Sequence, residues 1–314
     1  MTSTTTSHST DRRPRFEVHR PEGALGRSRE RLGWALVLPT VITLLVVAIY
    51  PLGRTLWLSF TNARLGGTRA VEFVGLENYV YLLTNDIFRK SIWNTIVFTV
   101  SSVALETILG LAVALVIHSN FKGRGLVRTA ILVPWAIPTV VSAQMWAWMF
   151  NDVFGVINDL LVVQLGILPQ KIAWLANPAT AMAAIVFVDV WKTTPFMALL
   201  LLAGLQVIPD DLYEAARVDG ANRWQSFWRM TVPLLKPALL VALVFRTMDA
   251  LRVFDVIFVM KAYALETISM AIFARQTMID LQRIGEGSAA SVIIFAIIAA
   301  FVLLYIRMLR TEEA

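Results

Sequence analysis

The chain contains no cysteine, which excludes disulfide bonds, thiolate metal sites and cysteine nucleophiles together. Histidine is almost as scarce: His8, His19 and His118 are the three in 314 residues. They offer no zinc-ligand spacing and no Ser-His-Asp arrangement. The phosphate-binding sequence G-x-x-x-x-G-K-[ST] is also missing, so the chain cannot bind ATP in the usual way. We therefore expect no catalytic residue, no metal site and no cofactor in this chain.

Charged residues are few as well. They make up 16% of the chain, whereas hydrophobic residues make up 57% and the mean hydropathy is +0.65. Such a chain is too apolar for an ordinary soluble domain. The formal net charge of +6 is typical of some nucleic-acid-binding proteins, but here basic residues flank apolar runs and would meet anionic lipid. The composition predicts an all-α integral membrane protein.

Six apolar runs are long enough to span a bilayer, because about 30 Å of hydrocarbon requires roughly 20 helical residues. The polar residues 1–32, rich in Ser, Thr and Arg, are predicted to be a disordered cytoplasmic tail. They contain no short apolar core before a small-residue cleavage site, so we do not expect a cleavable signal peptide. Residues 33–314 would form one six-helix transmembrane domain. The predicted spans are residues 33–52, 92–118, 127–150, 179–202, 237–260 and 288–308.

Loop charges predict the orientation of these spans. The connection at residues 119–128 contains Lys122, Arg124 and Arg128 and no acidic residue, and the N-terminal tail is rich in arginine. The positive-inside rule places both in the cytoplasm, although five basic residues in the first outer loop oppose it. An even number of spans returns the C-terminus to the same side. We therefore expect a multi-pass protein of the cytoplasmic membrane with both termini and residues 209–236 in the cytoplasm.

Residues 209–236 form a charged segment between two apolar runs. Asp211 and Glu214 have the spacing of a capping box at the start of a helix. Gly220 is placed to end that helix with a positive φ. A second helix with an aromatic face would follow, and Pro233 and Pro237 would stop it. The pattern predicts a docking element on the membrane surface.

The same segment resembles the EAA motif of permease subunits in bacterial ABC importers. The matching residues are Glu214-Ala215-Ala216, Asp219-Gly220-Ala221, Phe227, Val232-Pro233 and Pro237; Met230 and Val232 are mild departures from the usual isoleucine and leucine. Residues 73–79, Asn94-Thr95, 191–196 and 202–206 are similar to sugar-importer permeases of the maltose-transporter type. Residues 245–250 resemble the trehalose and maltose branch.

This resemblance implies a six-transmembrane-helix permease of the type I importer fold, with a cytoplasmic coupling helix. Its partners would be a second homologous permease, two copies of an ABC ATPase subunit that hold ATP and Mg²⁺, and an extracytoplasmic sugar-binding protein or lipoprotein. The chain would form half of the pathway for a trehalose- or maltose-like di- or oligosaccharide. It would couple to the ATPase through Glu214, Ala215, Ala216, Asp219, Gly220 and Ala221.

Charged residues inside the predicted spans are candidates for the substrate path, because an ionisable group in hydrocarbon is costly unless it faces water or a partner. Sugars need planar hydrogen-bonding groups and an aromatic face, which the fourth and fifth spans supply. The candidates are Asp189, Trp191, Lys192, Thr193, Arg246, Asp249 and Arg252. Alternatively, the charge series along the fifth span and the Asp189–Lys192 pair are salt bridges that lock the helices together. The series consists of Arg246, Asp249, Arg252 and Asp255. Glu106 in the second span is expected to form a hydrogen bond inside the bundle rather than to bind a ligand.

Two other classes of protein compete with the importer. One is an ion-coupled secondary transporter that uses Asp249 or Asp189 as a proton or sodium relay. The other is an intramembrane enzyme or scaffold. Neither requires a structured Glu-Ala-Ala helix at the cytoplasmic face, so the motif at residues 214–216 favours the importer.

Overall fold

The computed structural model describes residues 24–310 apart from residue 69, and the chain divides into two compact units, Met1–Gly53 and Arg54–Ala314. The described residues form helices and their connections, and no β-strand occurs among them. Residues with long aliphatic and aromatic side chains dominate the longer helices, as expected of segments whose backbone groups must be satisfied internally in lipid.

The described part of the first unit is helical throughout. Helix α1 (Ala24–Leu44) continues through a π-helical turn, η1 (Leu45–Ile49), into the beginning of α2 (Tyr50–Leu58). Helix α1 begins inside the segment that the sequence predicted to be a disordered tail. The remainder of that segment, residues 1–23, lies outside the described residues.

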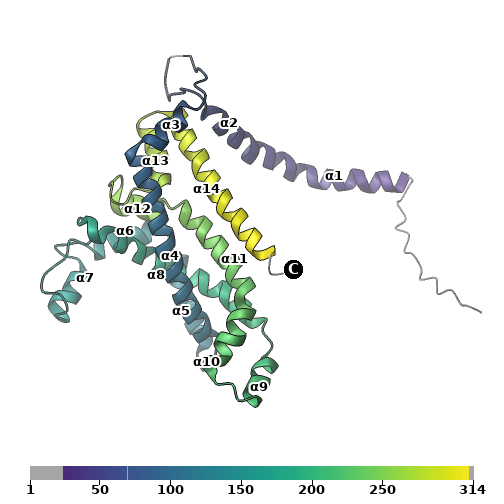
Figure 1. Ribbon diagram of the computed structural model, residues 1–314, viewed down its shortest axis with the longest axis vertical. Coiled ribbons are helices and arrows are strands. Elements are labelled where there is room, and N and C mark those ends of the chain that lie inside the picture. The colour runs from purple at the N-terminus through teal and green to yellow at the C-terminus, as the bar shows by residue number, and fades with distance from the viewer. Residues whose placement is uncertain (1–23, 69, 311–314) are drawn as a thin grey trace, which may run out of the picture. The chain divides into compact units, whose positions relative to one another are not determined.

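The second unit is an assembly of helices around α4, α8 and α11, which pack against one another. Within this unit, α3 and α13 lie at one end and α9 and α10 at the other (Figure 1). In chain order its helices and π-helical turns (η) after α2 are α3 (Glu77–Thr84), α4 (Asp86–His118), α5 (Arg124–Ala136), α6 (Thr139–Met149), α7 (Val156–Asn158), η2 (Asp159–Gln164), α8 (Pro178–Gln206), α9 (Asp210–Val218), α10 (Arg223–Ser226), η3 (Phe227–Thr231), α11 (Val232–Leu251), α12 (Asp255–Lys261), α13 (Met270–Arg275), η4 (Gln276–Asp280) and α14 (Ile284–Arg310).

Four helices among the described residues are long and apolar enough to cross a membrane, and the number rises to five if the bent pair α5 and α6 crosses as one segment. The predicted first, second, fourth and sixth spans coincide with these four helices. They are Glu30–Leu58, Asp86–His118, Pro178–Gln206 and Ile284–Arg307.

The third predicted span, residues 127–150, is bent rather than straight. Helices α5 and α6 meet at 90° across a short break. Pro138 precedes α6 and has no N–H to donate, and Ile137 before it is extended (φ −75°, ψ 133°). The third predicted span is therefore two helices, with the break at Ile137 and Pro138.

The fifth predicted span, residues 237–260, is not a continuous helix. Helix α11 ends at Leu251, and α12 begins at Asp255 after a non-helical connection. The prediction that Pro233 and Pro237 stop the preceding helix is also wrong. Both prolines lie within α11, which continues without a break from the π-helical turn η3.

Close helix contacts hold α4, α8 and α11 together. A Cβ atom at Gly110 of α4 would lie 2.6 Å from Met197 Cγ of α8, and one at Gly204 of α8 would lie 2.4 Å from Ala238 Cβ of α11. Small residues of this kind let helix backbones approach closely in membranes. The three helices can therefore bring their polar side chains within direct reach of one another.

Candidate functional site

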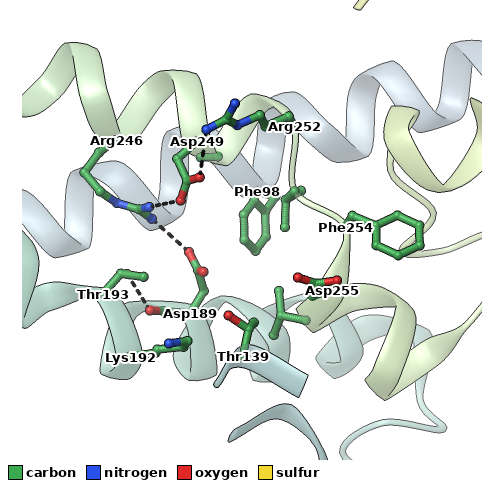
Figure 2. Close-up of a pocket in the computed structure, with 13 residues that line it drawn as sticks. Phe98, Thr139, Asp189, Lys192, Thr193, Arg246, Asp249, Arg252, Phe254 and Asp255 are labelled. Atoms are coloured by element: carbon green, nitrogen blue, oxygen red, sulfur yellow. Dashed lines mark hydrogen bonds and ion pairs between the residues drawn. The ribbon is translucent and has the colours of Figure 1, made fainter. Parts of the chain in front are cut away.

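Arg246 of α11 is the centre of a buried charge cluster. Its side chain is 3% exposed and binds Glu106 of α4 with two guanidinium nitrogens, Nε to Oε2 and Nη2 to Oε1, the second at 2.7 Å. Nη2 also lies 3.2 Å from Asp189 Oδ2 of α8, and Nη1 lies 2.7 Å from Asp249 Oδ2 one turn along α11 (Figure 2). One arginine therefore joins all three central helices. Its planar guanidinium suits this role because it presents donors in a fixed fork.

Two hydroxyl groups complete the surroundings of Glu106, whose side chain is fully buried. Ser102 Oγ of α4 lies 2.7 Å from Glu106 Oε1 and also within hydrogen-bonding distance of Asp189 Oδ2. Thr193 Oγ1 of α8 lies 2.6 Å from Glu106 Oε1 and equally close to the Asp189 backbone oxygen. A buried carboxylate is tolerated only with such compensation. Glu106 thus makes the intramolecular hydrogen bonds that its sequence position predicted.

The predicted alternation of charges along the fifth span is only partly present. Arg252 Nη2 lies 3.6 Å from Asp249 Oδ1, and both side chains are more than half exposed. The series ends there, because Arg252 caps α11 and Asp255 begins α12. In the described residues Asp255 has no ion-pair partner.

Lys192 of α8 does not pair with Asp189, contrary to the alternative considered from the sequence. Its Nζ donates to the backbone oxygens of Ile137 at 2.8 Å and Trp135 at 3.3 Å. Helix α5 ends between these residues, and the last carbonyls of a helix lack partners inside it. The ammonium group of a lysine donates hydrogen bonds to these carbonyls, and its positive charge is stabilised at the negative end of the helix dipole. Lys192 therefore ties α8 to the break between α5 and α6.

A cavity of about 270 Å³ opens beside this cluster. Six of the seven side chains predicted for the substrate path line it, and the cavity also contacts residues from α4, α6 and α12 (Figure 2). The six are Asp189, Lys192, Thr193, Arg246, Asp249 and Arg252.

Trp191 is the one predicted path residue that does not line the polar cavity. It lies on another face of α8, where its ring meets Trp146 edge-on at 5.3 Å between centroids. There it borders a larger, mostly apolar cavity together with Phe187. Neighbouring residues on a helix point about 100° apart, so Trp191 cannot share the direction of both Asp189 and Lys192.

Sequence reasoning missed the rest of the cavity wall. Phe98, Thr139, Phe254 and Asp255 line it, and Glu106 supports it from behind Arg246. Thr139 had no signal of its own, because the helix break before α6 decides where it points. Asp255 belonged to the charge series predicted along the fifth span, but it was not among the residues predicted for the substrate path. A buried acid in the second predicted span is a possible partner for an arginine in the fifth. The sequence does not show which helices pack together, however, and Glu106 and Arg246 are 140 residues apart.

The segment with the EAA motif adopts the predicted helix–glycine–helix form. Gly220 has φ +82°, and the N–H groups of Gly220 and Ala221 donate to Arg217 and Ala216 at the end of α9. This is the hydrogen-bond pattern of a Schellman motif. Glu214 lies 3.9 Å from Arg217, and both side chains are largely exposed.

The start of that segment differs from its prediction. Pro209, not Asp211, precedes α9, and no side chain caps this helix. The capping box lies one helix later, where Asn222 accepts from the Gln225 N–H and Gln225 Oε1 accepts from the Asn222 N–H. Of the six predicted coupling residues, Ala216 is buried, Ala215, Asp219 and Glu214 are exposed, and Gly220 and Ala221 form the turn.

Comparison with known proteins identifies the family. A model described as "Binding-protein-dependent transport system inner membrane component" matches residues 106–311, which include Arg246 with its three carboxylate partners, the EAA segment and every residue that lines the cavity except Phe98. The chain belongs to this family. Its members are membrane components of ABC transporters and not enzymes, and the all-α architecture described above is that of a type I importer permease.

Relatives match over nearly their whole length. The chain is 44% identical over 284 residues to the trehalose/maltose transport system permease protein MalF of Thermococcus litoralis, covering 89% of this chain and 94% of that protein. It is 39% identical over 281 residues to the trehalose transport system permease protein SugA of Mycobacterium tuberculosis, covering 90% and 89% respectively. A crystal structure of a bacterial ABC transporter that imports the acidic polysaccharide alginate matches with a TM-score of 0.80 and 26% identity over 90% of this chain and 96% of that one.

Proposed function

We propose that this permease forms half of the translocation pathway of an ATP-driven importer for an uncharged di- or oligosaccharide of the trehalose or maltose kind. The observation that carries the proposal is the polar cavity beside Arg246, formed where α4, α6, α8, α11 and α12 meet. Relatives at 44% and 39% identity, named for transport of trehalose and maltose, support the choice of substrate.

The cavity has the character of a passage for a polyhydroxylated solute. Hydroxyl, carboxylate, ammonium and guanidinium groups from four helices line it, together with the rings of Phe98 and Phe254. Its volume of about 270 Å³ is slightly below that of small-ligand pockets, which begin at roughly 300 Å³. A disaccharide would therefore require further space, which a second, homologous permease would supply across the pathway.

The cluster around Arg246 would be the rigid wall of this passage. Its hydrogen bonds are directed to Glu106, Asp189 and Asp249, so few donors remain for a substrate. Ligand contacts would instead come from the cavity-facing edges of Asp249, Arg252 and Thr193. The ion pairs of Arg246 would then be structural salt bridges, whereas Asp249, Arg252 and Thr193 would contact the substrate.

Coupling to ATP would occur at the opposite end of the unit from α3 and α13. Helix α9 and the Gly220 turn lie there with exposed acidic and small residues, including Glu214, Ala215 and Asp219 (Figure 1). An ABC ATPase subunit would dock on this segment and would carry the ATP and Mg²⁺. We propose six membrane crossings with both termini in the cytoplasm, counting the bent pair α5–α6 and helix α11 as crossings.

A solute-binding protein would deliver the sugar on the outer side. One of the similar structures, with 25% identity and a TM-score of 0.80, is an alginate transporter in complex with a pentasaccharide-bound periplasmic protein. That assembly supports the same kind of partner for this chain.

The test is sugar uptake by cells that carry or lack this chain. Deleting its gene, with the other importer genes intact, is expected to abolish accumulation of radiolabelled trehalose or maltose at micromolar concentration, and the intact chain supplied in trans restores it. Uptake of glycerol serves as the control for membrane integrity. Normal uptake of both disaccharides in the deletion strain would contradict the proposed function.

A further inference from the structure

We infer that Asp255 is a specificity-determining residue, which accepts hydrogen bonds from sugar hydroxyls and excludes anionic sugars from the cavity. This inference rests on the proposed function, since it assigns a substrate class to the same cavity. Asp255 is the first residue of α12 and lies across the cavity from Arg246 (Figure 2).

The first argument concerns which charges in the cavity are already engaged. Arg246 is shared among three carboxylates, and Lys192 donates to two backbone oxygens at the α5–α6 break. Arg252, the most exposed cation, lies 3.6 Å from Asp249. Every cation that lines the cavity therefore has a partner within the chain.

Asp255 differs from these residues because its carboxylate has neither an ion-pair nor a hydrogen-bond partner in the described part of the chain. The exposed side chain faces the cavity, where water or a ligand must satisfy it. An ionised carboxylate only accepts hydrogen bonds, and its two oxygens match a pair of neighbouring hydroxyl donors. Thr139 at the start of α6 also lines the cavity without a side-chain partner and adds a hydroxyl that can donate or accept.

The second argument is the charge balance. Among the described residues no cation lies within ion-pair distance of Asp255, whereas Asp189 and Asp249 both contact Arg246, so the carboxylate of Asp255 is a local excess of negative charge in the cavity wall. Protein walls of low dielectric strengthen the field of such an excess inside a cavity. A sugar with a carboxylate or sulfonate would meet an unpaired like charge, which is an effective device for rejecting it. A neutral sugar would meet an acceptor for its hydroxyl groups.

The experiment compares two disaccharides of similar size but different charge, and neutral maltitol, whose reducing-end ring is opened as in maltobionate, is the control for the change of shape. Equilibrium binding of maltose and of maltobionate, its carboxylate derivative, is measured on the assembled permease–ATPase complex in nanodiscs, without the solute-binding protein. The wild-type complex is expected to bind maltobionate about tenfold more weakly than maltose, as one unpaired like charge predicts. Asp255→Asn removes the charge at nearly constant size, so it should weaken maltose binding severalfold and bring the two affinities within about twofold of each other.

Two further variants separate specificity from general damage. Asp152→Asn removes an exposed carboxylate in the connection after α6, outside the cavity, and should leave both affinities unchanged. Thr139→Val should weaken both disaccharides and keep the preference for maltose. Complex yield should equal that of the wild type in each case, because neither Asp255 nor Thr139 has a side-chain partner among the residues that the structure describes.

The outcomes distinguish this inference from the function on which it rests. A preference for maltose that is unchanged in Asp255→Asn overturns the role of Asp255 and leaves the sugar importer in place. Stronger binding of maltobionate than of maltose by the wild-type complex also overturns it. Absence of uptake and of binding for every neutral disaccharide would remove the proposed function, and the assignment of Asp255 with it.

Discussion

Arg246 holds the central helices together, because its guanidinium binds Glu106 of α4 and Asp189 of α8. An arginine inside an apolar run predicts a buried partner or a wet cavity, and the structure contains both. The identity of the partner could not be predicted, because Glu106 lies on another helix and local spacing says nothing about it. The i, i+3 pair with Asp249 could be predicted, since helix geometry alone brings those residues together. The alternative Asp189–Lys192 pair, suggested by the same local rule, does not form, because Lys192 donates to backbone oxygens at the break after α5.

Replacing Arg246 is expected to disrupt assembly more than transport chemistry. Arg246→Ala removes the partner of the buried Glu106 and Asp189 carboxyl groups inside the helix packing, which costs roughly 3–5 kcal/mol. The assembled complex should be lost or greatly reduced in purified membranes. Arg252→Ala is the matched control: its pair with Asp249 is exposed and contributes only about 0–1 kcal/mol.

Complex yield, measured by size-exclusion chromatography after affinity purification, checks this prediction. The expected result is normal yield with reduced uptake for Arg252→Ala and low yield for Arg246→Ala. Full assembly together with wild-type uptake in Arg246→Ala would show that the cluster is neither structural nor part of the path.

Secondary structure elements were predicted well where one helix runs uninterrupted and poorly where it breaks. The predicted second, fourth and sixth spans lie on α4, α8 and α14, because their apolar character is continuous. The fifth predicted span is interrupted, because α11 ends at Leu251 and α12 packs on α6 as a separate helix. The sequence alone does not reveal this packing. The turn at Gly220 succeeded, because a glycine after a short amphipathic helix has a specific conformational reason to be there.

We predict that sugar uptake requires the left-handed backbone conformation of Gly220 in the turn after α9. Gly220→Val places a β-branched residue at φ +82°, which costs roughly 1–2 kcal/mol. No atom lies within 4 Å of the position of a Cβ, so steric contact adds nothing. Uptake should fall strongly while the protein remains in the membrane.

Gly220→Asn provides the control, because asparagine tolerates left-handed backbone conformations. It should retain most of the uptake measured with radiolabelled disaccharide. Equal activity of the valine and asparagine variants would show that the conformation of the turn does not control coupling.

For the whole molecule, family membership and helical architecture were predictable from composition and from the EAA motif. The bilayer constrains chain geometry strongly, so apolar length is a reliable signal. The polar cavity was predicted in part: six residues chosen for their chemistry line it, and Trp191 does not because helix rotation places it on another face.

Membrane topology makes a prediction at this scale. Reporter fusions after Ser119 and after Ala221 should be cytoplasmic, and a fusion within residues 166–171 should be extracytoplasmic. The charge of the 119–128 connection and the even number of crossings require this pattern. Paired alkaline phosphatase and green fluorescent protein fusions measure it. High phosphatase activity after Ala221 would place the EAA segment on the wrong side for an ATPase.

Transport by the purified system tests the central claim most directly. The permease pair and the ATPase subunits are reconstituted in proteoliposomes with ATP and Mg²⁺ at the ATPase face, and the solute-binding protein and radiolabelled trehalose or maltose are added on the other side. We predict that sugar accumulates only when both ATP and the binding protein are present, and that a proton or sodium gradient does not replace ATP. Accumulation driven by an ion gradient in the absence of ATP would contradict the account and would identify an ion-coupled transporter instead.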